Sequence, residues 1–180
     1  KTVAAFAGNF KTAHRKGVDF LSGYCAVKPA PADIVITTNG GYPLDQNAYQ
    51  CPKGMSAAEA TVNDGGVIIM LATCQDGHGG ESYYHSIADA ESADAFFQQC
   101  LHTPQVETLP DQWCAQIWCR IVRKYKVLFV ADKAQEQLIR DLKVEYFETL
   151  DEAYARAREL KGPDATLTCI PNGVSVVVKD

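Results

Sequence analysis

The sequence predicts an α/β protein with a doubly wound, mostly parallel sheet that carries helices on both faces. Short runs of β-branched and apolar residues alternate along the chain with longer stretches of helical periodicity, the order expected of a parallel sheet. The runs are continuous, as is typical of strands buried on both faces. With 180 residues, of which 47% are apolar, the chain can bury one sizeable core, so we expect a single domain over residues 1–180.

The first quarter of the chain predicts two strands separated by a helix. Residues 2–7 are short, apolar and compatible with a strand, and residues 10–24 repeat apolar side chains at helical spacing. Residues 33–38, DIVITT, are a β-branched run that predicts a buried parallel strand. A Gly- and Pro-rich loop follows, and we expect it to lead into a short helix from Asp45.

The rest of the chain continues the alternation. Ser56 followed by Glu59 is a capping-box pattern, which indicates a helix over 56–63. Pro171-Asn172-Gly173 is a turn signal, so the two strands around it could pair as a C-terminal hairpin. The remaining predicted elements are strands over 67–73, 126–131, 144–147, 166–170 and 174–178, and helices over 92–102, 111–125, 133–141 and 150–161.

Composition and charge argue against two classes of partner. The formal net charge is −5 and the pI is about 5.3, so the chain offers no basic surface for nucleic acid. The longest apolar runs are too short to span a bilayer, and no signal peptide opens the chain. Because the first residue is Lys1 and not Met, we expect the chain to be a fragment of a longer protein.

The cysteines favour a reducing compartment. There are seven, which is an odd number, and no two of them form a CxxC pair. Reduced and mostly buried thiols in a cytoplasmic protein are therefore the favoured interpretation. The four histidines do not cluster in sequence, and no HExxH spacing occurs, so we predict no complete metal site within this chain.

The loop Asn39–Gln46, NGGYPLDQ, lacks both the GxGxxG and the GxxxxGK[ST] spacing, so it does not indicate a dinucleotide or ATP site. Its adjacent glycines could let the backbone approach a ligand closely, or they could simply form a tight turn with Asp45 as a helix cap. Ligands of doubly wound sheets bind beyond the carboxyl ends of the strands, which is where this loop is expected.

Tyr49, Gln50 and Lys53 follow that loop. On a helix Gln50 and Lys53 would share a face, and an amide beside an ammonium group would suit a carboxylate substrate. The alternative is a solvated helix end with an ordinary surface lysine.

His78, Glu81 and one of the two tryptophans could also belong to a site. His78 and Glu81 lie in the second Gly-rich loop, where the imidazole could be a general acid/base or a metal ligand, or could face water. Asp111 is a plausible cap for the helix that carries Trp113 and Trp118. These tryptophans are five residues apart and face different directions, so we expect one in the core and the other over a ligand or an interface.

The chain resembles the C-terminal half of the nickel-dependent lactate racemase family. The resemblance is carried by DIVITTNGGYPLDQNAYQ and KGMSAAEATVNDGGVIIMLATCQDGHGGE, and also by AAFAGNFKTAHRKGVDF, LPDQW and IPNGVSVVV, so it covers almost the whole chain. It implies a two-domain α/β enzyme with its active site in the cleft between domains. It also implies that a nickel-pincer nucleotide, held by the N-terminal domain that is absent here, takes a hydride from C2 of a 2-hydroxy acid and returns it to either face.

The resemblance assigns roles to four residues of this chain. Gln50 and Lys53 match the pair that binds and orients the substrate, and they are our candidate catalytic residues. Tyr49 and Trp113 match aromatic residues that lie near the cofactor.

Three hypotheses follow. The first is the substrate-side domain of a 2-hydroxy-acid racemase or epimerase, an isomerase whose isolated C-terminal fragment we expect to be inactive. The second is a non-catalytic module that binds small carboxylates. The third is a structural or dimerising domain. A large exposed apolar face would fit either this hypothesis or the loss of a domain partner.

Overall fold

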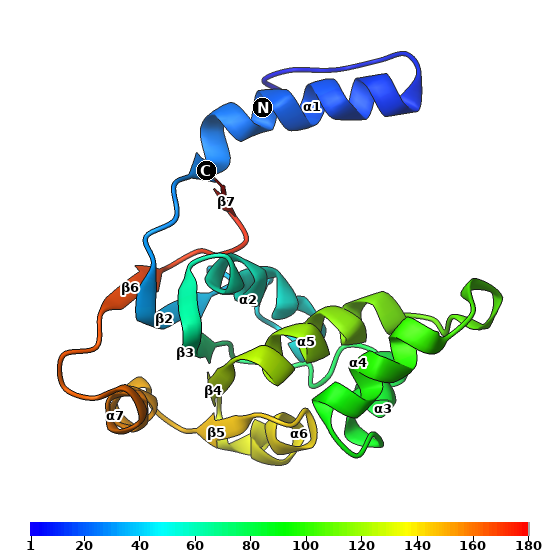
Figure 1. The fold of residues 1–180 in the computed structure, drawn as a ribbon. Coiled ribbons are helices and arrows are strands. Elements are labelled where there is room, and N and C mark those ends of the chain that lie inside the picture. Colours follow the sequence, from blue (N-terminus) through cyan, green and yellow to red (C-terminus); the bar gives the residue numbers. More distant parts are fainter. Residues whose placement is uncertain (180) are drawn as a thin grey trace.

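The computed structural model describes residues 1–179, and its centre is a five-stranded sheet in the order β5-β4-β3-β2-β6 (Figure 1). Every neighbouring pair of strands is parallel, which confirms the predicted α/β fold. The strands are β2 (Ala32–Thr38), β3 (Val62–Leu71), β4 (Lys126–Val130), β5 (Glu145–Phe147) and β6 (Leu167–Ile170). Strands β3, β4 and β5 follow one another on one side of β2, whereas β6 lies on its other side. The topological switch point of the sheet is therefore between β2 and β6.

Helices cover both faces of this sheet (Figure 1). One face is covered by α2 and α5, and α3 and α4 pack on the outside of α5, while α7 covers the other face. The change of face at α7 follows from right-handed crossovers, because this helix connects strands in the opposite direction. The helices are α2 (Pro52–Glu59), α3 (Glu81–Ala88), α4 (Ala93–His102), α5 (Gln112–Lys124), α6 (Glu136–Asp141) and α7 (Leu150–Lys161), with 3-10 turns η1 (Ala48–Gln50), η2 (Gln105–Glu107) and η3 (Lys133–Gln135).

The core is split by the sheet into two layers. Alternate residues of β3 enter different layers, so Ile68 packs with Trp118 on the α5 side and Ile69 packs with Ala153 on the α7 side. All four are fully buried, and each large apolar side chain buried in this way contributes about 1.5–3 kcal/mol to folding. The indole of Trp118 also donates a hydrogen bond of 2.9 Å to the carbonyl of Leu142, which satisfies its one polar group.

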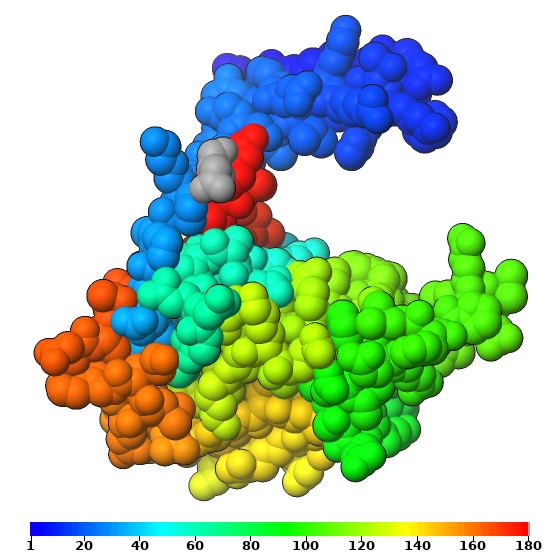
Figure 2. Space-filling model, in the orientation of Figure 1, coloured from blue at the N-terminus to red at the C-terminus, as the bar shows by residue number. Residues whose placement is uncertain are grey.

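The first helix, α1 (Phe10–Cys25), confirms the predicted amphipathic helix but stands apart from the sheet and its covering helices (Figures 1 and 2). None of its residues is buried. The predicted strand over 2–7 is wrong, because this segment runs back along α1 and places Phe6 against Phe20, with ring centroids 5.7 Å apart. A lone strand here would have no neighbour to satisfy its backbone groups.

The predicted C-terminal hairpin is also wrong. The last strand, β7 (Val177–Val178), pairs in parallel with β1 (Ala26–Val27), which enters the body from α1. The turn before it is bound across the end of the sheet instead. The amide of Gly173 donates to the carbonyl of Thr38 (2.8 Å), and the Thr38 hydroxyl donates to the carbonyl of Pro171 (2.7 Å). The chain therefore leaves the sheet end sideways and cannot fold back onto β6.

Near the site, one predicted helix begins at a different residue and one helix was not predicted. The helix predicted from Ser56 begins four residues earlier at Pro52, and the Ser56 hydroxyl donates to the Pro52 carbonyl (2.7 Å) without capping the helix. Helix α3 was not expected, because Glu81 follows a Gly-rich loop and Gly80 offers no capping side chain. Within residues 1–179, no helix combines the length and apolar character needed to cross a bilayer.

Candidate active site

A buried amide fixes the segment that carries the candidate substrate-binding residues. Asn39, directly after β2, is fully buried. Its Nδ2 donates to the carbonyls of Leu44 (2.7 Å) and Gln50 (2.8 Å), and its Oδ1 accepts from the amide of Gly54 (3.0 Å). Because these bonds hold both sides of the Gln50–Lys53 segment, Asn39 sets its position relative to the sheet. Sequence reasoning missed this residue, since a polar side chain after a strand gives no sign of its partners.

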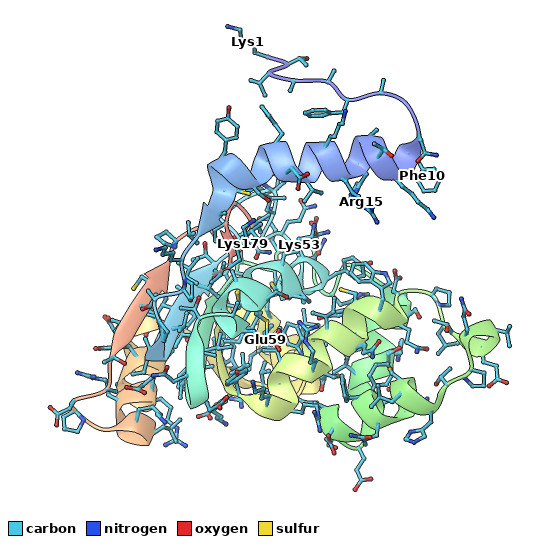
Figure 3. The ribbon with its side chains drawn as sticks, turned by 45° about the horizontal axis from the view of Figure 1, so that its top comes forward. Lys1, Phe10, Arg15, Lys53, Glu59 and Lys179 are labelled. Atoms are coloured by element: carbon cyan, nitrogen blue, oxygen red, sulfur yellow. The ribbon has the colours of Figure 1, made fainter. Side chains whose placement is uncertain are left out.

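Gln50 and Lys53 lie side by side, as the resemblance implied. Gln50 ends the 3-10 turn η1 and Pro52 is the first residue of α2, a position where proline fits because its missing N–H would have no helical partner. The Lys53 Nζ donates to the Gln50 Oε1 at 2.5 Å. Lys53 is exposed, and Figure 3 shows it on the edge of α2 nearest α1. The ammonium group keeps two further N–H donors for a carboxylate.

Two aromatic residues form a wall beside Lys53. The rings of Tyr49 and Trp113 meet edge-on, with centroids 6.1 Å apart and planes at 87°. Trp113 is 57% exposed whereas Trp118 is fully buried, so the expectation of one core tryptophan is confirmed. A hollow of about 110 Å³ lies here, lined by Tyr49, Pro52, Lys53, Ser56, Trp113, Cys114 and Ile117. The structure therefore brings Tyr49, Lys53 and Trp113 together, with Gln50 bound to Lys53.

The Tyr49 phenol and the neighbouring Cys114 thiol both have raised pKa values, so both keep their protons at neutral pH. Burial, followed by a hydrogen bond to Asp111, raises the pKa of Tyr49 to about 12. The Tyr49 hydroxyl donates to Asp111 Oδ1 at 3.0 Å. Burial likewise raises the pKa of Cys114 to about 12, so this thiol is a poor nucleophile at neutral pH. The expected cap role of Asp111 is wrong, because its side chain makes no bond to α5 and binds Tyr49 instead.

His78 does not join this group through its side chain. Its ring stacks on Tyr84 of α3, with centroids 5.1 Å apart, and its Nδ1 accepts from the amide of Gly80 (3.1 Å). The Nε2 lies 3.6 Å from Glu81 Oε1. Only the backbone of His78 reaches the site, where its carbonyl accepts from the amide of Tyr49 (3.0 Å).

A second hollow lies at the carboxyl ends of the strands, where the Gly-rich loops were expected to form a site. It encloses about 320 Å³ and includes Asp45, Asp132 and Glu148 among its lining residues but no lysine or arginine. Asp45 accepts from the amide of Thr73 (3.3 Å) and caps no helix, which corrects the expected role. An anionic ligand would be repelled here, so the positive charge beside Gln50 makes the first hollow the better site for an acid.

Among residues 1–179, no three histidine, cysteine or acidic side chains come together in a way that could hold a metal ion.

Comparisons with known proteins show the family to which the chain belongs. Residues 27–178 match the family described as the lactate racemase C-terminal domain. The chain is 48% identical over 179 residues to a lactate racemase from Lactiplantibacillus plantarum, covering 99% of this chain and 42% of the relative. It is 46% identical over 180 residues to a lactate racemase from Thermoanaerobacterium thermosaccharolyticum, covering 100% of this chain and again 42% of the relative.

A solved structure has the same fold. The lactate racemase apoprotein from Thermoanaerobacterium thermosaccharolyticum superposes with a TM-score of 0.93 at 46% identity, covering 99% of this chain and 43% of that one. The chain thus spans about two-fifths of the length of the curated relatives that it matches, 42% in both cases.

Proposed function

Because this chain belongs to the lactate racemase C-terminal domain family, we propose that it forms the substrate-binding part of an enzyme that interconverts the two enantiomers of a small 2-hydroxy acid. The observation that carries this proposal is the Gln50–Lys53 pair, whose amide oxygen and ammonium nitrogen are 2.5 Å apart beside an aromatic wall. Such a pair offers charge and direction to one carboxylate.

Each residue of the pair has a distinct proposed role. The Lys53 ammonium group would pair with the carboxylate of the acid, and the Gln50 amide would orient it by a directional hydrogen bond. Holding the acid in one place while its C2–H bond breaks is orientation catalysis, which lowers the entropy cost of the reaction. Neither residue transfers a proton in this proposal, so both act as binding groups throughout.

The aromatic wall suits a flat cofactor. The rings of Tyr49 and Trp113 meet edge-on, and the indole of Trp113 is 57% exposed. Such a surface would fit a pyridine-type ring and exclude water from one side of it. We propose that they contact a nickel-pincer nucleotide held by a preceding domain, which supplies a hydride acceptor and donor for C2 when bound. The relatives are more than twice as long as this chain, which supports such a domain as its partner, and the isolated chain would then be inactive.

The proposed compartment is the cytoplasm. All seven cysteines are free, and the buried ones have no disulfide partner. Free buried thiols fit a reducing environment.

The proposal is tested with the full-length, cofactor-loaded protein, starting from a single lactate enantiomer and following the other by chiral chromatography. Lys53→Ala should reduce kcat/KM by roughly 100-fold, because the substrate loses its charged anchor, while the cofactor remains attached. Lys133→Ala is the matched control, since Lys133 is also exposed but lies outside the hollow, and it should leave the rate unchanged.

Equal activity in the two variants would refute the anchor role of Lys53. If the wild-type protein exchanges no short 2-hydroxy acid but binds one in a Lys53-dependent manner, the chain is a carboxylate-binding module instead.

A further inference from the structure

We propose that Asp111 is a positioning residue that holds Tyr49, and with it Trp113, in the geometry of the aromatic wall. Its effect on turnover rests on the function proposed above, but its effect on Tyr49 does not.

The backbone of Asp111 adopts a left-handed conformation, with φ 60° and ψ 2°, immediately before α5. Within the described chain only two other residues besides glycine, Cys74 and Lys143, have a positive φ. Among residues with a side chain, aspartate and asparagine take this conformation most readily, so Asp111 suits the position. A residue that caps a helix with its side chain normally has extended backbone. Asp111 does not, and its side chain makes a different contact.

That contact is the phenol of Tyr49, which lies 62 positions away in the sequence and donates to Asp111 Oδ1 at 3.0 Å. The Asp111 side chain makes no bond to the first turn of α5, where the amides of Cys114 and Ala115 donate to the Asp111 backbone carbonyl instead. The Asp111 carboxylate is thus directed at a residue far away in the sequence, which indicates that this contact secures the orientation of the Tyr49 ring.

The first turn of α5 holds Tyr49 at both of its ends. While Asp111 accepts from the phenol, the Cys114 Sγ donates to the carbonyl of Tyr49 at 3.4 Å. Trp113 lies between these two residues and meets the Tyr49 ring edge-on. Tyr83 of α3 also meets the Tyr49 ring edge-on, with centroids 5.4 Å apart. The first turn of α5 therefore fixes the hydroxyl end of Tyr49 and carries Trp113, and loss of the Asp111 bond would loosen that end of the ring.

The hydrogen bond also limits what Tyr49 can do. Its hydroxyl has one proton, which is committed to Asp111, and the raised pKa of about 12 keeps that proton in place at neutral pH. Tyr49 therefore acts through the position of its ring and not as a general acid toward the substrate.

Three variants of the intact protein separate positioning from a merely structural role. Asp111→Gly removes the acceptor but adopts the left-handed conformation freely, so the variant should still fold. Asp111→Asn keeps an acceptor oxygen and also tolerates this conformation. Tyr49→Phe keeps the ring and removes the hydroxyl, and it identifies the Tyr49 signal by its absence.

The first measurement needs no turnover. In protein labelled with ¹³C at the tyrosine carbon that bears the hydroxyl, NMR follows the ionisation of Tyr49 as pH rises. Asp111→Gly should lower the midpoint by about one unit toward the ordinary value, with Asp111→Asn in between because it keeps the bond but not the charge. An unchanged midpoint in Asp111→Gly would overturn the proposal.

The second measurement is racemisation by the cofactor-loaded enzyme. Asp111→Gly and Tyr49→Phe should each lower kcat by roughly tenfold with KM within about twofold, since Gln50 and Lys53 are untouched, and Asp111→Asn should stay within about threefold of wild type. Equal losses in the Gly and Asn variants would contradict positioning. Absence of racemisation in the wild type would refute the proposed function, and the NMR result would still decide the role of Asp111.

Discussion

At the level of single residues, buried or bonded polar groups fix the parts that carry the site. Asn39 donates a hydrogen bond to the Gln50 carbonyl, and Asp111 accepts one from the Tyr49 hydroxyl. At the opposite end of β2, Asp33 also binds neighbouring segments through hydrogen bonds. Its carboxylate accepts from Asn63 Nδ2 (3.0 Å), from the Thr166 amide (2.9 Å) and from the Thr166 hydroxyl (2.8 Å), so it joins β2 to β3 and to the residue that precedes β6.

The Asp33 cluster predicts how stability depends on acid. The hydrogen bonds from Asn63 and Thr166 lower the pKa of Asp33 from 3.8 to about 2. Because the folded pKa is below the ordinary one, this residue stabilises the fold above about pH 4, and the contribution is lost as pH falls toward 2.

We expect Asp33→Asn to lower the melting temperature at pH 7 and to make its fall between pH 5 and pH 2 less steep, measured by thermal unfolding. An acid dependence identical to wild type would show that Asp33 does not ionise with an altered pKa. Asp19→Asn, a change to an exposed acid of α1 outside the cluster, is the control.

At the level of elements, close contact between α2 and the ends of β2 and β6 places the substrate-binding residues. A Cβ on Gly54 would lie 2.5 Å from Asn39 Oδ1 and 2.9 Å from the Thr38 carbonyl. A Cβ on Gly173 would lie 2.7 Å from the Cα of Gly54. Only glycine fits at these crossings, so the helix that carries Lys53 can sit directly on the switch point of the sheet.

Gly54→Ala is therefore expected to destabilise the fold by about 1–3 kcal/mol, because the added methyl group has no space among backbone and buried side-chain atoms. Denaturant unfolding measures this change. Gly23→Ala in α1 is the matched control, since no atom lies within 4 Å of the added Cβ, and it should stabilise its helix by up to about 1 kcal/mol. Equal stability of the two variants would contradict the packing argument.

At the level of the whole molecule, the exposed apolar face of α1 is the feature that the chain itself does not explain. Phe10, Val18, Leu21 and Tyr24 are exposed, and no residue of the helix is buried. The matching family domain begins at residue 27, after α1, and the curated relatives are more than twice as long. The face thus fits the lost-domain interpretation, in which the remainder of a longer polypeptide covers it.

We expect the 180-residue chain to bind an apolar fluorescent dye more strongly than the full-length protein does. Leu21→Gln together with Val18→Gln should reduce this binding in the short chain. Val106→Gln is the control, because Val106 is 94% exposed but lies in η2, away from α1, and its change should have little effect. Equal dye binding by the short chain and the full-length protein would rule out coverage of α1.

Part of the fold was determined by local sequence. The strands predicted at 33–38 and 126–131 and the helix predicted at 150–161 match β2, β4 and α7 within one residue. Continuous apolar runs and helical periodicity give these elements directly, since each depends on its own residues. The predicted hairpin failed for the opposite reason, because the pairing of β7 with β1 depends on a segment about 150 positions away.

The sequence by itself determined the parallel α/β sheet and, through its family resemblance, the identity of Tyr49, Gln50, Lys53 and Trp113 as candidates. Residue spacing alone left Gln50 and Lys53 open to an ordinary surface role. Only the tertiary structure decided that Tyr49, Lys53 and Trp113 line one hollow and that Gln50 is bound to Lys53 beside it. It also decided that Asn39 binds the Gln50 carbonyl and that Asp111 binds the Tyr49 hydroxyl. The reason is that hydrogen bonds between segments far apart in the chain leave no periodic signal in the sequence.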